Sequence, residues 1–118
     1  GRDKEMKIAV AAVAGQVAEH FGHCETFLIY DSLSGEASFV PNPGHKPGFL
    51  PNFLGDMGVE VIIAGGMGGG AIEIFCARNI DVVTGAQGDA LGAAKAFSQG
   101  ELKTSGSVCH EHAQGEHH

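Results

Sequence analysis

The sequence predicts an α/β protein with a mixed five-stranded sheet flanked by helices. Short apolar runs typical of buried strands recur along the chain, and glycine-rich or proline-rich turns separate them. In the second half, these runs alternate with segments in which apolar residues recur at helical spacing. Strands that alternate with helices require parallel pairing and right-handed crossovers, whereas the first three strands follow one another directly and are expected to form a meander.

Five stretches have the composition of strands. The first is continuously apolar, which is typical of a strand covered on both faces. A short turn, SLSG (32–35), joins the second stretch to the third, so these two are expected to form a hairpin. The five stretches are KIAVAAV (7–13), ETFLIYD (25–31), EASFVPN (36–42), VEVIIAG (59–65) and IDVVTG (80–85).

Three stretches are expected to be helical. FLPNFLGDMG (49–58) and AIEIFCARN (71–79) each carry one apolar stripe. DALGAAKAFSQG (89–100) has Asp89 as its expected N-cap and Gly100 as its end. The resulting order, β-β-β-α-β-α-β-α, matches the RNase H-like topology.

Composition limits the possible partners and compartments. The 118 residues fit one domain, and 7 basic against 14 acidic residues give a net charge of −7. Such a surface repels phosphate backbones, so nucleic acid is not an expected partner. The three cysteines, at 24, 76 and 109, are odd in number and scattered, which argues against a disulfide framework and suits a reducing cytoplasm. Cys76 falls on the apolar stripe of its helix and is expected to be structural.

The chain is expected to work in the cytoplasm as one domain with a tail. The apolar run IAVAAVA near the N-terminus is about seven residues long, too short for a signal-peptide core or a membrane span. Residues 6–100 are expected to form the single domain. Residues 101–118 contain almost no apolar side chains and are expected to be flexible.

The segment GGMGGG (65–70) is the most informative motif. It follows a buried strand and opens a helix, so it is expected at the carboxyl edge of the sheet, where α/β proteins bind ligands. Its glycines let a ligand approach the backbone, and the free N–H groups of the helix's first turn can bind an anion. Met67 offers a soft thioether that could fill an apolar gap or touch a soft metal or a metal sulfide.

A nucleotide is the weaker alternative ligand for this loop. Residues 66–71 formally fit the dinucleotide pattern G-x-G-x-x-A. However, no acidic residue ends the following strand to hold a ribose, and no lysine follows the glycines as in a P-loop.

The segment AEHFGHCETFLIYD (18–31) brings three possible metal ligands into five positions: His20, His23 and Cys24. Because the first strand is expected to lie beside the fourth, this loop and the glycine loop can meet at one edge of the sheet. Each histidine alone could instead be a capping or surface residue. Cys24 directly precedes a buried strand and could belong to the core.

The remaining chemistry is confined to the tail. Cys109, His110 and His112 could bind zinc, copper or nickel. The first strand has no carboxylate, which excludes an RNase H-type two-metal nuclease. The chain also lacks a G-x-S-x-G nucleophile motif and a C-x-x-C redox pair.

These motifs together resemble a known family. EHFGHCETFLIYD, then NPGH, then VEVIIAGGMGGGAIEIF are similar to the nitrogenase iron–molybdenum cofactor biosynthesis family of dinitrogenase accessory factor-like proteins, over residues 6–100. The resemblance implies an RNase H-like mixed sheet and noncatalytic binding of a molybdenum-containing metal–sulfide cluster. The short acidic chain and histidine-rich end are most similar to members from sulfate-reducing bacteria, which hold a molybdenum–copper–sulfide cluster noncovalently.

The resemblance also implies which residues contact the cluster. Carried over by position, they are His20, Phe21, Gly22, His23, Gly65, Gly66, Met67, Gly68 and Gly69. The expected function is therefore a carrier in cofactor assembly, transfer or metal homeostasis, with a cluster donor or recipient protein as partner. Two alternatives stay open: a nucleotide-binding or small-anion-binding regulatory domain, and a copper or zinc chaperone acting through the tail.

Overall fold

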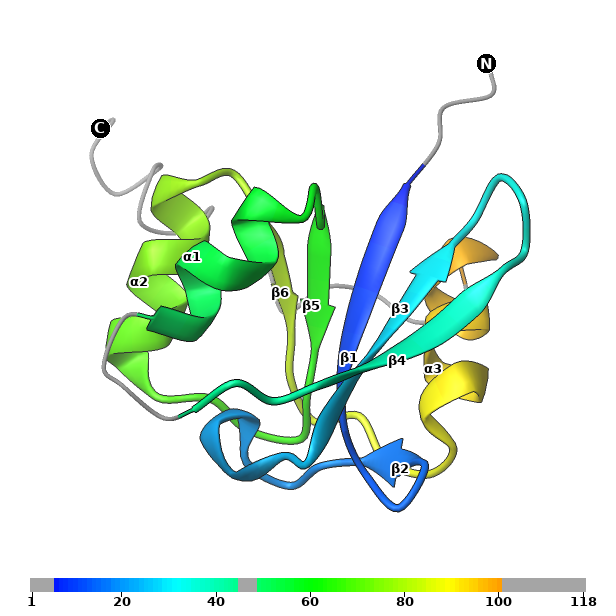
Figure 1. Cartoon of the computed structure of the whole chain (residues 1–118), viewed down its shortest axis with the longest axis horizontal. Helices are drawn as coiled ribbons and strands as arrows, with labels where there is room; N and C mark the ends of the chain where they lie inside the picture. The colour runs from blue at the N-terminus through cyan, green and yellow to red at the C-terminus, as the bar shows by residue number, and fades with distance from the viewer. Residues whose placement is uncertain (1–5, 45–48, 101–118) are drawn as a thin grey trace.

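The computed structural model describes residues 6–44 and 49–100 (Figure 1). It contains the five expected strands and three expected helices, together with a two-residue strand and one turn of 3-10 helix. In chain order the elements are β1 (Lys7–Val13), β2 (Gln16–Val17), η1 (Phe21–His23), β3 (Thr26–Asp31), β4 (Ala37–Pro41), α1 (Phe49–Asp56), β5 (Val61–Ile63), α2 (Gly69–Ala77), β6 (Asp81–Val83) and α3 (Ala90–Ser98).

The sheet is mixed, as predicted. Its order is β4-β3-β1-β5-β6, with β2 paired to the end of β1. The β1–β3 and β3–β4 pairs are antiparallel, and the β1–β5 and β5–β6 pairs are parallel. The first and fourth predicted strands correspond to β1 and β5, and they pair with each other as expected.

Strand β2 was not predicted from the sequence. Ala14 (φ 53°) and Gly15 (φ 82°) form a left-handed turn that folds the chain back on β1. Gln16 and Val17 then pair with Val13 and Ala12. Two residues are too few to show a strand periodicity in the sequence. The pairing can therefore be recognised only from the structure, in which the turn at residues 14–15 folds the chain back on β1.

Two apolar layers sandwich the sheet (Figure 1). Helices α1 and α2 cover one face and α3 covers the other. Ala9 and Ala11 belong to the core under α1 and α2, whereas Ile8, Val10 and Ala12 belong to the core under α3. This explains why β1 is continuously apolar, since alternate side chains enter different cores.

The helix ends follow capping rules. Asp89 is the N-cap of α3, and its Oδ2 accepts a hydrogen bond from the Gly92 N–H at 2.8 Å, as expected. Helix α2 begins at Gly69, two residues before the predicted start, with Gly68 as its N-cap. None of the helices within 6–44 and 49–100 has the length and apolar character to span a membrane.

The cysteines differ in state. Cys24 is a buried free thiol, whereas Cys76 is disulfide-bonded. The disulfide at Cys76 was not expected from the sequence, because an odd, scattered set of cysteines argues against a framework of several disulfides but not against a single one. The predicted tail, 101–118, lies outside the described residues, and so do its three candidate ligands Cys109, His110 and His112.

Candidate functional site

Three loops meet at one edge of the sheet. Strands β1, β5 and β6 run parallel, so the segments that follow them begin at the same edge. These segments are residues 14–25, 64–68 and 84–89. Both motifs singled out in the sequence lie on the first two segments.

The histidine loop and the glycine loop are joined by direct hydrogen bonds. The Gly65 N–H donates to the Ala18 carbonyl at 2.8 Å, and the Phe21 N–H donates to the Gly66 carbonyl at 2.9 Å. The expectation that the two loops approach each other is confirmed. Their pairing makes one continuous rim from segments more than forty positions apart in the chain.

The glycines of residues 65–70 serve two different purposes. A Cβ on Gly65 would lie 2.9 Å from the Ala18 carbonyl oxygen, and one on Gly66 would lie 3.1 Å from the Glu19 carbonyl oxygen. A Cβ on Gly68, Gly69 or Gly70 would meet nothing within 4 Å. The first two glycines therefore permit the loop crossing, while the last three leave open space at the start of α2.

A buried aromatic side chain fixes the histidine loop. Phe21 is 5% exposed, and its ring centroid lies 5.7 Å from that of Phe27 and 5.4 Å from that of Phe75. His20 and His23 flank this anchor and are exposed. Their ring centroids are 5.7 Å apart in an edge-to-face arrangement. The loop thus holds two imidazoles at a defined spacing on the surface.

The two loops share one cavity of about 520 Å³. It is lined by His20, Phe21, Gly22, His23, Gly66, Met67 and Gly68. These are seven of the nine residues that the family resemblance implied as contacts. Gly65 lies in the loop crossing and lines a neighbouring cavity instead, and Gly69 is the first residue of α2.

The N-terminus of α2 places peptide dipoles next to this cavity. Gly68 caps α2 without a side chain, and the helix has no acidic residue in its first turn. The first N–H groups of an α-helix have no partner within the helix, and they carry its partial positive charge. Among the described residues, no lysine or arginine lines the cavity. An anion held here would be bound by amides and imidazoles.

Comparison with known proteins identifies the family. The model of a family described as "dinitrogenase iron-molybdenum cofactor" matches residues 4–100, most of the chain. The chain belongs to this family. The resemblance drawn from its motifs is therefore confirmed, and the family connects the chain to cofactor-related proteins.

Three relatives illustrate how widely this family fold extends. The uncharacterized protein MJ0580 of Methanocaldococcus jannaschii is 30% identical over 108 residues, covering 85% of this chain and 92% of MJ0580. The crystal structure of PH0822 is 34% identical with a TM-score of 0.75, covering 85% of this chain and 95% of that one. The apo orange protein of Desulfovibrio gigas is 22% identical with a TM-score of 0.76, over 88% and 96% of the two chains. At that identity, the last comparison shows the shared fold alone.

Cys24 does not line this family member's cavity. Its side chain is 4% exposed, and the Asn42 side-chain amide donates to its carbonyl oxygen at 2.8 Å and to its Sγ at 3.6 Å. Burial raises the pKa of the Cys24 thiol to about 11, so it is protonated at neutral pH. Of the two roles left open by the sequence, the structure places Cys24 in the core.

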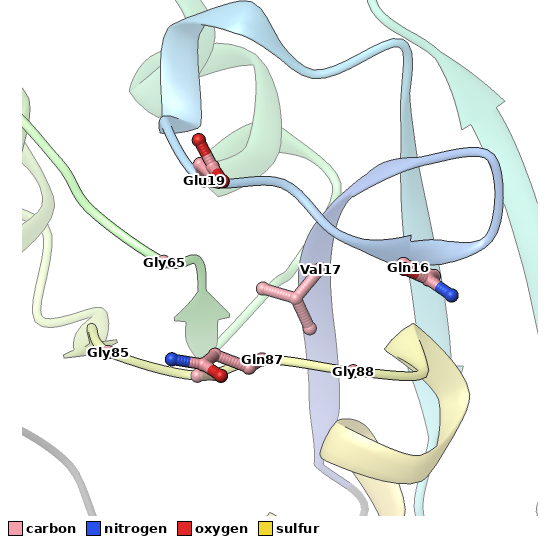
Figure 2. Close-up of a pocket in the computed structure, with 8 residues that line it drawn as sticks. Gln16, Val17, Glu19, Gly65, Gly85, Gln87 and Gly88 are labelled. Carbon is pink, nitrogen blue, oxygen red and sulfur yellow. The ribbon is translucent and has the colours of Figure 1, made fainter.

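A second cavity, of about 490 Å³, lies on the other side of the loop crossing (Figure 2). Figure 2 shows Val17 of β2 and Gln87 of the loop after β6 beside it, with Glu19 above. Residues 85–88 line this cavity, and none of them was expected from the sequence to belong to a binding site. The glycines of TGAQGD, directly after a parallel strand, were the signal that could have found them.

Histidine, cysteine and carboxylate side chains alone do not form a metal centre in the described part of the chain. Across 6–44 and 49–100, no three histidine, cysteine, aspartate or glutamate side chains are grouped closely enough to hold a metal ion. A conventional structural zinc site needs four such ligands. Whatever binds at the rim in this region must therefore rely partly on other groups.

Proposed function

We propose that the chain is a noncatalytic carrier of a molybdenum-containing metal–sulfide cluster, held in the cavity between residues 20–23 and 66–68. One observation carries the proposal: an imidazole-bearing loop and a glycine loop line the same cavity, next to the N-terminus of α2. Membership of a cofactor-related family supports it. Residues 6–100 would then be the cluster-binding domain, acting in the cytoplasm.

The chemistry of the cavity suits such a cargo. Thiomolybdate-type clusters are anions whose sulfides accept hydrogen bonds from N–H groups. Gly68 and Gly69 expose the start of α2 without side chains in the way, so several amides can approach one anion. The cavity of about 520 Å³ is within the usual range for small-ligand sites.

Copper is the second metal we propose, in a molybdenum–copper–sulfide cluster. Neutral imidazole is a ligand for copper, and His20 and His23 present two imidazoles on one rim. Sulfides that bridge to copper would be held by the amides of the glycine loop. The two loops would then bind different parts of one cluster.

The overall charge supports transfer rather than permanent storage. A chain of net charge −7 repels an anionic cluster at long range, and only local dipoles offset this repulsion. Binding should therefore be reversible and should tighten as ionic strength rises, because salt screens the long-range term. A donor or recipient protein could exchange the cluster at the exposed rim.

Anaerobic reconstitution tests the proposal. Apo protein is mixed with tetrathiomolybdate and copper(I) and passed through a desalting column, and molybdenum, copper and sulfide are measured together with the visible spectrum. Wild-type protein should retain both metals and a strong visible absorption. Replacing both His20 and His23 with alanine should release most of the copper and the colour.

Two further samples separate the alternatives. Replacing the tail residues His110 and His112 with alanine is the matched control and should leave the retained metal unchanged. A result in which only the tail variant loses metal would contradict the proposal and support a tail chaperone. Thermal stabilisation by a nucleotide, with no retained metal or colour, would contradict it in favour of a regulatory domain.

A further inference from the structure

Met67 lines the proposed site, but the binding described so far gives its side chain no role. It is the only residue of the segment 65–70 with a side chain, and it lines the same cavity as His20 and His23. It also packs partly buried against the core under α1 and α2. A thioether thus lines the same cavity as two imidazoles, and Phe21 and three glycines complete the lining.

The spacing of the two imidazoles suits a single shared ion. Metal–nitrogen bonds of about 2.0–2.1 Å, with each ring centroid about 1.1 Å behind its nitrogen, place two centroids roughly 5 to 6 Å apart for nitrogen–metal–nitrogen angles between about 110° and 150°. The ring centroids of His20 and His23 are 5.7 Å apart. The observed separation falls within that range, and Phe21 anchors the loop that carries both histidines in the core.

The donor set selects the kind of metal. The cavity is lined by two imidazoles and one thioether, and none of its lining residues is a carboxylate or a cysteine. Calcium and magnesium require oxygen ligands, and structural zinc prefers four nitrogen, thiolate or carboxylate ligands. Thioether and imidazole together suit a soft monovalent ion, of which copper(I) is the biological example.

We propose that His20, His23 and Met67 bind one copper(I) ion in this cavity, whether or not molybdenum and sulfide are present. The inference deepens the proposed function and rests on it only for the use of the cavity. A bound monovalent cation beside the N-terminus of α2 would add to the positive potential of the helix dipole. It would thereby offset the net negative charge of the chain where the cluster anion binds.

Silver(I) is a suitable probe because it is soft, monovalent and needs no reductant. The full chain, with His110, His112, His117 and His118 replaced by alanine, is labelled with ¹³C at the methionine methyl groups and titrated with silver(I). We expect the Met67 methyl signal and the ring signals of His20 and His23 to shift together. The shifts should be complete at one equivalent of silver.

A methionine in a comparable setting provides the matched control. Met57 also packs partly buried against the same core but lines a different cavity. Met67→Leu should weaken copper(I) binding, measured anaerobically by competition with bicinchoninate, by at least about tenfold, the low end of what changing even an outer partner costs a metal site. Met57→Leu should leave copper(I) affinity unchanged. Both substitutions keep the side-chain volume and should preserve folding.

The outcomes distinguish this inference from the proposed function. If the Met67 methyl signal does not move, or if Met67→Leu binds copper(I) as tightly as wild type, the three-residue site is wrong even when cluster reconstitution succeeds. If binding also survives the joint replacement of His20 and His23, the ion lies elsewhere and the inference is again overturned. A third outcome is that copper(I) binds through all three residues but the protein retains no molybdenum or sulfide after reconstitution. That outcome would uphold the inference and contradict the proposed function.

Discussion

Substituting Gly65 with alanine tests how the two loops are joined. The added methyl carbon would lie 2.9 Å from the Ala18 carbonyl oxygen and 2.9 Å from the Glu19 Cα, where ordinary contacts begin at 3.4 Å. Both opposing atoms belong to the backbone, so no side-chain rotation can relieve the overlap. The Ala18 N–H also donates to the Ala11 carbonyl at 2.8 Å, which ties the opposing segment to β1.

The expected cost follows from this geometry. The two backbones must separate by about 0.5 Å, and overpacking of this kind costs about 1–3 kcal/mol. For a domain of roughly 100 residues, each kcal/mol lowers the melting temperature by about 4–8 °C. Gly65→Ala should therefore lower the free energy of unfolding by about 2 kcal/mol and the melting temperature by roughly 10 °C.

Urea unfolding and scanning calorimetry measure both quantities, with Gly70→Ala as the control. A Cβ on Gly70 meets nothing within 4 Å, and Gly70 lies in the first turn of α2, so alanine there should leave stability unchanged or raise it by up to about 1 kcal/mol. If Gly65→Ala proves as stable as Gly70→Ala, the loop crossing is not as tight as we describe. The assignment of Gly65 to the crossing would then be wrong.

Three further predictions concern residues around the site. Because burial raises the pKa of Cys24 from 9.0 to about 11, its protonated thiol stabilises the fold below pH 9, and about 2–3 kcal/mol of that contribution is lost as the pH rises to 11. Between pH 9 and 11, urea unfolding should therefore show a steeper loss of stability in wild type than in Cys24→Ala. Equal slopes would contradict the placement of the Cys24 thiol in the core. Phe21→Ala removes a buried ring and should cost about 3–5 kcal/mol in urea unfolding, whereas Phe21→Leu should cost clearly less, so equal losses would argue against ring packing as the anchor. Asp89→Ala removes the N-cap of α3 and should cost about 1 kcal/mol by the same measurement, while Asp89→Asn should retain most of the stability; an unchanged Asp89→Ala would refute the capping role.

The strands and helices were predictable because their signals are local. The continuous apolar run of residues 7–13 and the alternation of strand and helix after residue 48 were enough to predict a mixed sheet and the adjacency of β1 and β5. Capping chemistry likewise predicted Asp89 at the start of α3. Strand β2 was missed because Gln16 and Val17 pair only through the turn at residues 14–15. The state of Cys76 was missed because residue counts do not reveal pairing.

The residues of the candidate site could be predicted from the sequence, but the separate role of each residue could not. The sequence predicted that His20 and His23 lie at the same sheet edge as the glycine loop, and hydrogen bonds join the two segments there. The sequence did not show which glycines leave room for a ligand and which permit close packing, and the structure shows that Gly65 and Gly66 are needed for a backbone crossing. It also left Cys24 undecided, because burial depends on neighbours that are distant in the chain.

By itself, the sequence determined the fold class, the family and the identity of the residues at the rim. These properties follow from periodicity, capping and motif order, which act over a few neighbouring positions. The tertiary structure decided which glycines face open space, which imidazoles share a cavity with Met67, and that residues 85–88 line a second cavity. Such facts depend on packing between segments far apart in the chain, since an added Cβ would meet opposing backbone at 2.9 Å at Gly65 and 3.1 Å at Gly66 but nothing within 4 Å at Gly68.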